Sequence, residues 1–260
     1  MPDAFYEPDG EGYRATELTR GPWDPDSQHA GPPAALLGHA IETLEDAADF
    51  HVGRITFEIL GAVPIGHLRP SAEIVRPGRR VQLVEAELEA DGEVVMRARA
   101  WRIRTGDVEI PDDLLHRQAV RGPEAGRDAP FFPTGHDTGY HSAMEYRFLE
   151  GEFLEPGPAK VWMRMRHPLI EGVEITPLQR ILTAADSGNG VSATLDYRSH
   201  LFINVDLTLH LERLPAGEWV GLDAITLPQP NGVGTSDTLL FDQTGRIGRA
   251  LQTLLVASRD

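Results

Sequence analysis

One order of predicted elements occurs twice along the chain, and it constrains the fold more than any single motif does. In the first half, two short strand-like runs precede a Pro/Asp-rich loop, the apolar helical segment AALLGHAIETLEDAA (34–48) and several long strand patterns. In the second half, EYRFLEG and AKVWMRMR repeat the opening hairpin, and TPLQRILTAADS (176–187) repeats the helix before further strands. The halves share element order and length rather than identity. One solitary helix among strands in each half predicts an α+β fold, in which antiparallel strands wrap around that helix.

The segment between the two occurrences, residues 106–139, has no sustained hydrophobic period and is rich in Pro, Gly and charge. This composition is typical of a linker. The sequence therefore predicts an N-terminal unit over residues 1–105, a linker over 106–139 and a C-terminal unit over 140–260. We expect the two sheets to pair edge to edge within the chain, because unpaired edges invite aggregation.

The register of one hairpin follows from its alternation of apolar and charged residues. A three-residue loop from Asp91 to Glu93 sets Glu87 opposite Arg97 and joins apolar face to apolar face, whereas a two-residue loop would mix them. We therefore expect the longer loop, with a bulge at Gly92. The glutamates and arginines then form cross-strand ion pairs on a solvated face.

Asp186 ends the apolar helical run of the second half. The core-facing stripe of that run consists of Leu178, Ile181, Leu182 and Ala185. Asp186 lies about 40° from Leu182 around the helix, at the edge of the stripe. A carboxylate there is costly unless it is paired, hydrogen-bonded or catalytic, and the helix dipole disfavours it. Gly188 and Gly190 are expected to be left-handed caps. Two interpretations remain open, a functional carboxylate or a solvent-facing residue in a fraying last turn.

Composition limits the chemistry that the chain can perform. The absence of cysteine excludes disulfides and thiolate catalysis, and the histidines show no zinc-like spacing, so we expect no metal and no cofactor. A net charge of −16 argues against nucleic acid or an anionic membrane as partner. The chain has no apolar run long enough to span a membrane and no secretory signal at its start. A cytoplasmic location is therefore expected.

With the repeat in place, the chain resembles the acyl-CoA thioesterase II-like family. The segments that carry the resemblance are HAGPPAALL, RPGRRVQLVEAELEADGEVVMRARA, AADSGNG, NVDLTLHL and GRALQTLLV. The resemblance implies a double hotdog, in which two antiparallel sheets each wrap around one long helix. It also implies association into homo-oligomers and hydrolysis of an acyl-CoA thioester to a carboxylic acid and CoA.

The resemblance further implies a catalytic site. In that family, a water is held by an aspartate on the second helix, a threonine-like residue that begins a strand, and a strand glutamine. Asp186 matches the aspartate, Gln252 matches the glutamine, and Asn204 stands in the place of the threonine. Asn204 is a departure, but its amide can still donate to or accept from a water. Gln252 shares strand parity with apolar neighbours, so its amide is expected to be buried and to need partners.

Three further residues are candidates for substrate binding. His29 and Gly31 stand at the start of the first predicted helix, where free backbone N–H groups attract anions or a carbonyl oxygen. Arg76, in the RPGRR segment, is a candidate for contact with the CoA phosphates. Aligning the two helices places Ile41 opposite Asp186, so we expect one site per chain.

Two other functions compete with hydrolysis at this stage. The aspartates and histidine of DPDSQH (24–29) suggest a hotdog-type enoyl-CoA hydratase or dehydratase, although their spacing fits that family poorly. A non-catalytic acyl-CoA-binding module is favoured by the asparagine at position 204.

Overall fold

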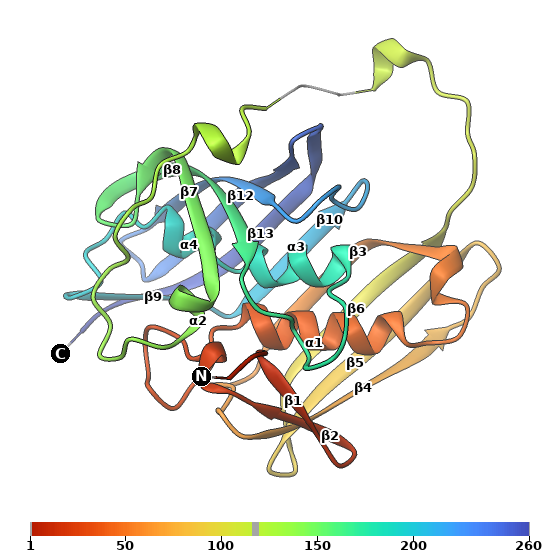
Figure 1. The fold of residues 1–260 in the computed structure, drawn as a ribbon, viewed down its shortest axis with the longest axis horizontal. Helices are drawn as coiled ribbons and strands as arrows, with labels where there is room; N and C mark the ends of the chain where they lie inside the picture. Colours follow the sequence, from red (N-terminus) through yellow and green to blue (C-terminus); the bar gives the residue numbers. More distant parts are fainter. Residues whose placement is uncertain (1, 116–119, 260) are drawn as a thin grey trace.

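Antiparallel pairing joins the strands of both halves into one sheet, and two helices lie side by side on one face of it (Figure 1). This computed structural model describes residues 2–115 and 120–259. The sheet has 13 strands in the order β1-β2-β4-β5-β6-β3-β10-β13-β12-β11-β8-β7, with β9 paired to β13. Every ladder between these strands is antiparallel.

The elements of the first half follow the predicted order. They are β1 (Tyr6–Asp9), β2 (Gly12–Ala15), η1 (Glu17–Thr19), α1 (Gly31–Glu42), η2 (Ala47–Asp49), β3 (Phe50–Ile59), β4 (His67–Arg76), β5 (Val81–Ala90) and β6 (Glu93–Arg104). Helix α1 ends six residues earlier than the pattern over 34–48 predicts. Asp46 adopts a left-handed conformation with φ 56°, which the α-helix cannot accommodate, and the chain turns there into η2 and β3.

The second half repeats this order. Its elements are α2 (Tyr140–Ala143), β7 (Met144–Glu152), β8 (Glu155–Met165), α3 (Pro177–Ala185), α4 (Gly188–Val191), β9 (His200–Asn204), β10 (Asp206–Leu211), β11 (Val220–Pro228), β12 (Val233–Asp242) and β13 (Gly245–Ser258). Between the halves lie two short 3₁₀ turns, η3 (Asp112–Leu114) and η4 (Pro123–Ala125). In Figure 1 the residues that follow β6 rise away from the sheet as far as η3, and η4 lies beside β7 and β8.

The two sides of the sheet have equivalent strand orders, counted outward from its centre. Strands β3 and β10 meet there with Thr56 opposite Thr208, and the two hydroxyls lie 3.1 Å apart. Beyond this seam, β6, β5 and β4 on one side correspond to β13, β12 and β11 on the other. The predicted α+β fold, with two antiparallel sheets joined edge to edge, is confirmed. The unit boundaries at residues 105 and 140 remain predictions.

The two helices pack closely because of one glycine. A Cβ at Gly38 of α1 would lie 2.4 Å from Leu182 Cδ1 of α3, so a larger residue would displace the buried Leu182 side chain or push the helices apart. The predicted stripe on α3 is buried, as are Leu36, Leu37 and Ile41 of α1. These side chains fill the space between helices and sheet.

The β5–β6 hairpin shows the predicted pairs but a different loop. Glu87 lies opposite Arg97, with 2.8 Å between Oε1 and Nε. The prediction of a three-residue loop is wrong. Ala90 pairs with Glu93 across a two-residue turn whose residues both have positive φ, and the register shifts between Glu89 and Leu88. The backbone twist of this two-residue turn matches the twist of the two strands. The bulge between Glu89 and Leu88 then brings Leu88 opposite Met96, so that apolar residues share one face.

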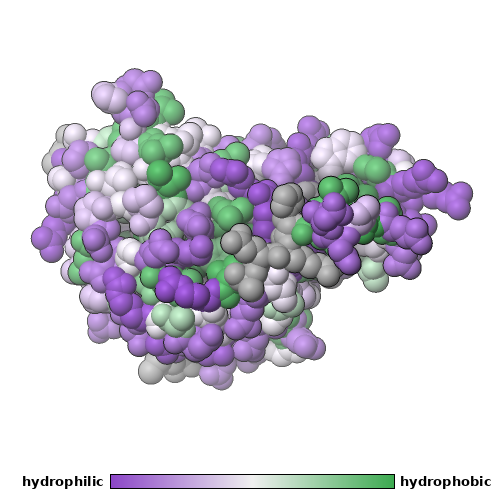
Figure 2. All heavy atoms as spheres, turned by 90° about the horizontal axis from the view of Figure 1, so that it is seen from above, coloured by the Kyte–Doolittle hydropathy of each residue, from purple (hydrophilic) through white to green (hydrophobic). Residues whose placement is uncertain are grey.

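Figure 2 shows the molecule from above the view of Figure 1. Hydrophilic side chains cover most of that face, and apolar ones occur in small groups among them. Among the described residues, none of the helices has the length and apolar character needed to cross a membrane.

Glu42, the last residue of α1, faces the first turn of α3. Its Oε2 accepts a hydrogen bond of 2.8 Å from Thr176 Oγ1, and Thr176 is the N-cap of α3. Burial raises the pKa of Glu42 to about 7, against the opposing effect of hydrogen bonds from Thr176 and Gln179. The folded state therefore binds a proton at this carboxyl more tightly than the unfolded chain does.

This difference predicts a pH-dependent gain in stability for Glu42→Gln. Between pH 4.5 and about 7 the folded state holds the extra proton, so the wild-type free energy of unfolding falls as pH rises through this window. Glutamine can still accept from Thr176 and carries no charge. The variant should therefore be more stable by up to about 3 kcal/mol above pH 7 and nearly unchanged at pH 4.5. Urea denaturation at both pH values measures this, and an equal effect at the two would contradict it.

Candidate active site

Asp186 lies directly after α3 and is buried, with 3% of its surface exposed. The interpretation of a solvent-facing residue is therefore wrong. The prediction of left-handed glycine caps is also wrong, because neither Gly188 nor Gly190 has a positive φ and the chain continues into α4. Gly188 serves a different purpose. A Cβ there would lie 2.5 Å from Thr238 Oγ1, so glycine allows α4 to approach the sheet next to Gln252.

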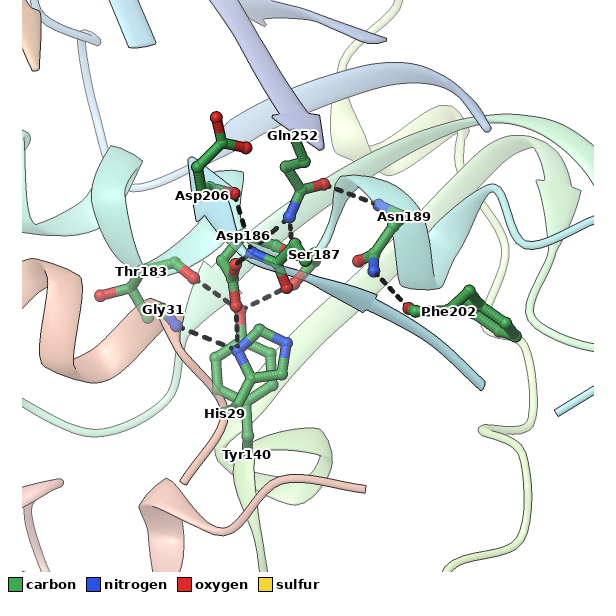
Figure 3. A network of polar contacts seen from close by, with 11 residues as sticks. His29, Gly31, Tyr140, Thr183, Asp186, Ser187, Asn189, Phe202, Asp206 and Gln252 are labelled. Atoms are coloured by element: carbon green, nitrogen blue, oxygen red, sulfur yellow. Dashed lines mark hydrogen bonds and ion pairs between the residues drawn. The ribbon is translucent and has the colours of Figure 1, made fainter. Parts of the chain in front are cut away.

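Two amides from separate strands hold the Asp186 carboxylate. Asn204 Nδ2, at the end of β9, donates to Asp186 Oδ1 at 2.8 Å. Gln252 Nε2, on β13, donates to the same oxygen at 3.2 Å and to the Asp186 backbone carbonyl at 3.1 Å (Figure 3). Gln252 is 3% exposed, and its Oε1 accepts from the Asn189 backbone N–H at 3.1 Å. The predicted need of this buried amide for partners is thus met by Asp186 and α4.

His29, from the loop before α1, approaches the other carboxylate oxygen. Its Nδ1 lies 3.0 Å from Asp186 Oδ2. The imidazole stacks on the Tyr140 ring with 3.7 Å between centroids, and the Tyr140 hydroxyl donates to the Thr183 carbonyl (Figure 3). Burial lowers the pKa of His29, and the neighbouring Asp186 carboxylate partly offsets this. The imidazole is therefore neutral at neutral pH.

The contacts of His29 Nδ1 decide which ring nitrogen carries the proton. Nδ1 also lies 3.2 Å from the Gly31 backbone nitrogen, but a ring nitrogen offers either a proton or a lone pair in its plane. A lone pair at 3.0 Å from a carboxylate oxygen would be repelled, so we assign the proton to Nδ1. This assignment leaves Nε2 as an acceptor and the Gly31 N–H without one.

Gly31 is required at the start of α1 for a steric reason. A Cβ at this position would lie 2.3 Å from the Thr183 carbonyl oxygen of α3. The next two residues are prolines, which have no N–H group. Gly31 therefore carries the one N–H group of the first three helical positions, and this N–H points at His29 Nδ1.

The site opens onto a cavity of about 540 Å³ between the two halves. Asp186, Asn204 and His29 belong to its wall, whereas Gln252 and Gly31 stand behind them. Much of the remaining wall is apolar and includes Trp23, Val63, Phe131, Phe132, Tyr146, Phe153, Val191 and Phe202. Polar groups gathered at one part of an apolar cavity are typical of a small-molecule site.

The structure does not bring Arg76 to this cavity. Its guanidinium lies 5.7 Å from the centre of the Trp101 ring, near the far end of β4. Conversely, the sequence reasoning missed Tyr140 and the pair Phe131-Phe132. Two adjacent phenylalanines in an otherwise polar segment are the signal that could have found the latter. Within residues 2–115 and 120–259, no group of three or more His, Cys, Asp or Glu residues could hold a metal ion.

The first half has apolar residues where the second has this site. Counted from Thr56 and Thr208 at the seam, Val52 corresponds to Asn204 and Ala100 to Gln252. In the helix alignment, Ile41 corresponds to Asp186. Ile41, Val52 and Ala100 are all buried. The polar group of Asp186, Asn204 and Gln252 therefore has no equivalent at the corresponding positions of the first half.

Comparisons with known proteins agree with this architecture. Residues 19–103 match the family described as acyl-CoA thioesterase N-terminal domain, and residues 123–256 match the acyl-CoA thioesterase C-terminal domain. No curated protein matches the chain significantly.

Several solved structures share the fold at low sequence identity. An acyl-CoA thioesterase II from Mycobacterium marinum is 16% identical with TM-score 0.64, covering 96% of this chain and 93% of its own. A candidate thioesterase II from Thermobifida fusca is 15% identical with TM-score 0.75 over 96% and 93%. A hot dog fold protein from Alicyclobacillus acidocaldarius is 16% identical with TM-score 0.70 over 99% and 97%. These similarities support the double hotdog fold.

Proposed function

Because this chain belongs to the acyl-CoA thioesterase family, its reaction is thioester hydrolysis, and we propose that Asp186, Asn204 and Gln252 form the catalytic site. The observation that carries the proposal is a buried carboxylate on the wall of an apolar cavity, held by two amides and one histidine. A carboxylate at the C-terminal end of a helix is electrostatically unfavourable. Its retention there, with three donors arranged around it, fits a catalytic use better than a structural one.

The proposed reaction uses water as the nucleophile. The acyl group lies in the apolar part of the cavity, with its thioester carbonyl next to Asp186. Asp186 accepts a proton as the water oxygen attacks the carbonyl carbon, the C–S bond breaks, and the CoA sulfur leaves and takes up a proton. The products are a carboxylic acid and CoA. General-base assistance of this kind contributes roughly 10²–10⁴-fold in rate.

The amides position the carboxylate rather than the water. Both donate to Asp186 Oδ1, so the water is expected at Oδ2. Among the described residues, the polar partner of Oδ2 is His29. Asn204 performs this task with an amide where the family has a hydroxyl.

His29 is a second candidate for the proton acceptor. Its protonated Nδ1 faces Asp186, and Nε2 has no partner among the described residues. An imidazole oriented in this way by a carboxylate is a common general base. In this alternative Asp186 positions His29 instead of the water.

The hydratase alternative receives no support from the same geometry. Asp24 and His29 both belong to the cavity wall, but the Asp24 carboxylate accepts from the Asp26 backbone N–H and His29 pairs with Asp186. The homo-oligomer and the cytoplasmic location remain predictions.

The proposed function is tested by release of free thiol from a panel of acyl-CoA substrates. A thioesterase releases CoA, a hydratase changes only the acyl chain, and a binding protein does neither. We expect thiol release that scales with enzyme concentration and continues over many turnovers. Consumption of an enoyl-CoA without thiol release would overturn the proposal.

A further inference from the structure

Aromatic rings are concentrated around the cavity. The wall comprises 29 of the 260 residues, yet it holds seven of the chain's 18 Phe, Tyr and Trp residues. An even distribution would place about two there. One of the seven, Tyr140, is occupied in supporting His29. The others have no role in the proposed chemistry, so the acyl group is the part of the substrate that they would contact.

Four of these rings form one cluster around Phe131. Phe131 stacks on Phe132 with centroids 4.1 Å apart and meets Phe153 edge-on at 4.6 Å. Tyr146 meets Phe153 edge-on at 4.9 Å. Trp23 and Phe202 form a separate edge-on pair at 5.0 Å. The cavity wall thus contains two groups of aromatic rings, which pack on one another in stacked and edge-on geometry.

A wall rich in aromatic rings favours an acyl group that is itself aromatic over a straight alkyl chain. Aromatic pairs in edge-to-face or offset geometry are stabilised beyond their buried area, because the positive edge of one ring meets the negative face of another. A straight alkyl chain has no such edge and gains from area alone. None of the methionines in the described part of the chain belongs to this wall, although methionine is the side chain that adapts best to varied ligands.

We propose that the preferred substrate of this site is a CoA thioester whose acyl group carries an aromatic ring. The inference rests on the proposed function, since it assigns the acyl group of the same hydrolytic site. Phe131 is the residue expected to set the preference, because it contacts Phe132, Phe153 and His141 at once. It comes from the segment between the two halves, which therefore contributes to specificity.

The test compares two substrates with equal numbers of acyl carbons, 3-phenylpropanoyl-CoA and nonanoyl-CoA, by thiol release. We expect kcat/KM to favour the ring by roughly tenfold, the effect of one or two aromatic contacts. In Phe131→Leu, which keeps an apolar side chain, this ratio should fall toward unity, because kcat/KM for 3-phenylpropanoyl-CoA falls more than kcat/KM for nonanoyl-CoA. Phe50→Leu is the matched control. Phe50 is also half-buried but lies beneath Arg102 and Arg104, outside the cavity wall, and its replacement should leave the ratio unchanged.

Failure of the inference can be distinguished from failure of the proposed function. Equal or faster hydrolysis of nonanoyl-CoA, or an equal loss for both substrates in Phe131→Leu, would overturn the aromatic preference and leave hydrolysis intact. Absence of thiol release from every acyl-CoA would overturn the hydrolytic function. Calorimetric binding of both substrates to the Asp186→Asn variant then decides the inference separately, since tighter binding of 3-phenylpropanoyl-CoA supports it and equal binding refutes it.

Discussion

Replacing Asp186 by asparagine is expected to lower kcat/KM for acyl-CoA hydrolysis by about 10²–10⁴-fold while the protein stays folded. An amide cannot accept a proton from water at neutral pH. Asparagine can still accept from Asn204 and Gln252 through its oxygen, and its NH₂ group can donate to His29 Nδ1 once that nitrogen loses its proton to Nε2. The melting temperature should therefore stay level or rise slightly, since a charge has left the unfavourable end of α3.

Two control variants accompany this measurement. Gln252→Ala removes a positioning hydrogen bond but leaves the base, so turnover should fall by only about one or two factors of ten. Asp223→Asn, an exposed carboxylate paired with Lys160 on the sheet, should leave turnover unchanged. Full activity in Asp186→Asn would clear Asp186 of a catalytic role. A collapse of the melting temperature with lost activity would identify it as a structural residue instead.

The proton acceptor can be identified from the pH dependence of kcat/KM. Burial lowers the pKa of His29, so a reaction that depends on neutral His29 should stay constant down to pH 6.5 and decline only as pH falls further, when the imidazole gains a proton. If Asp186 alone accepts the proton, a variant without this imidazole, His29→Asn, should lack that decline and keep measurable turnover.

Replacing Arg213 by methionine is expected to cost about 2–3 kcal/mol of stability at pH 7, less than for a fully buried pair because the Arg213 side chain is itself 37% exposed. Arg213 donates to both oxygens of Asp242, at 2.5 and 2.7 Å, and the Asp242 side chain is only 1% exposed. Burial acts to raise the pKa of Asp242, but hydrogen bonds from Arg213, Ala216 and Thr244 outweigh it and hold the pKa well below its usual range. Without Arg213, a buried carboxylate loses its counter-charge.

The sign of this effect can be checked with pH. A lowered folded-state pKa contributes stability that is present above the unfolded value, about 3.9, and is lost as pH falls toward the folded value. The destabilisation by Arg213→Met should therefore shrink in strongly acidic buffer. Arg246→Met breaks a neighbouring but exposed ion pair with Glu212 and should cost no more than about 1 kcal/mol. Equal losses in the two variants would contradict the buried-pair argument.

Much of the fold follows from local patterns in the sequence. Alternation located the β5–β6 register, because shifting Glu87 away from Arg97 would bury charge, and helical spacing located the stripe on α3. These patterns report burial, which a single segment already encodes. The turn at Asp91-Gly92 was predicted with the wrong length, since the bulge that corrects the register lies further along the strands and leaves no mark on the turn itself.

The site could be predicted only in part. Asp186, Asn204 and Gln252 were named by family resemblance, and the structure brings the Asn204 and Gln252 amide nitrogens within 3.2 Å of Asp186 Oδ1. The contact of His29 with Asp186 joins residues 157 positions apart, and no spacing reports which loop side chain will face a distant helix end. Phe131 was missed for a related reason. Its segment has no periodicity, so its path over the cavity depends on tertiary packing alone.

The seam between β3 and β10 has a consequence for how this protein can change. If two identical chains met at such a seam, every substitution would occur at two places, and a residue suited to one would have to be tolerated at the other. Here both partners belong to one polypeptide, so each substitution occurs once. Asp186 can carry charge while Ile41, at the equivalent position of the first half, fills the core. In the same way, the positions equivalent to Asn204 and Gln252 are occupied by Val52 and Ala100. Joining the halves in tandem thus releases each from the requirement to resemble the other.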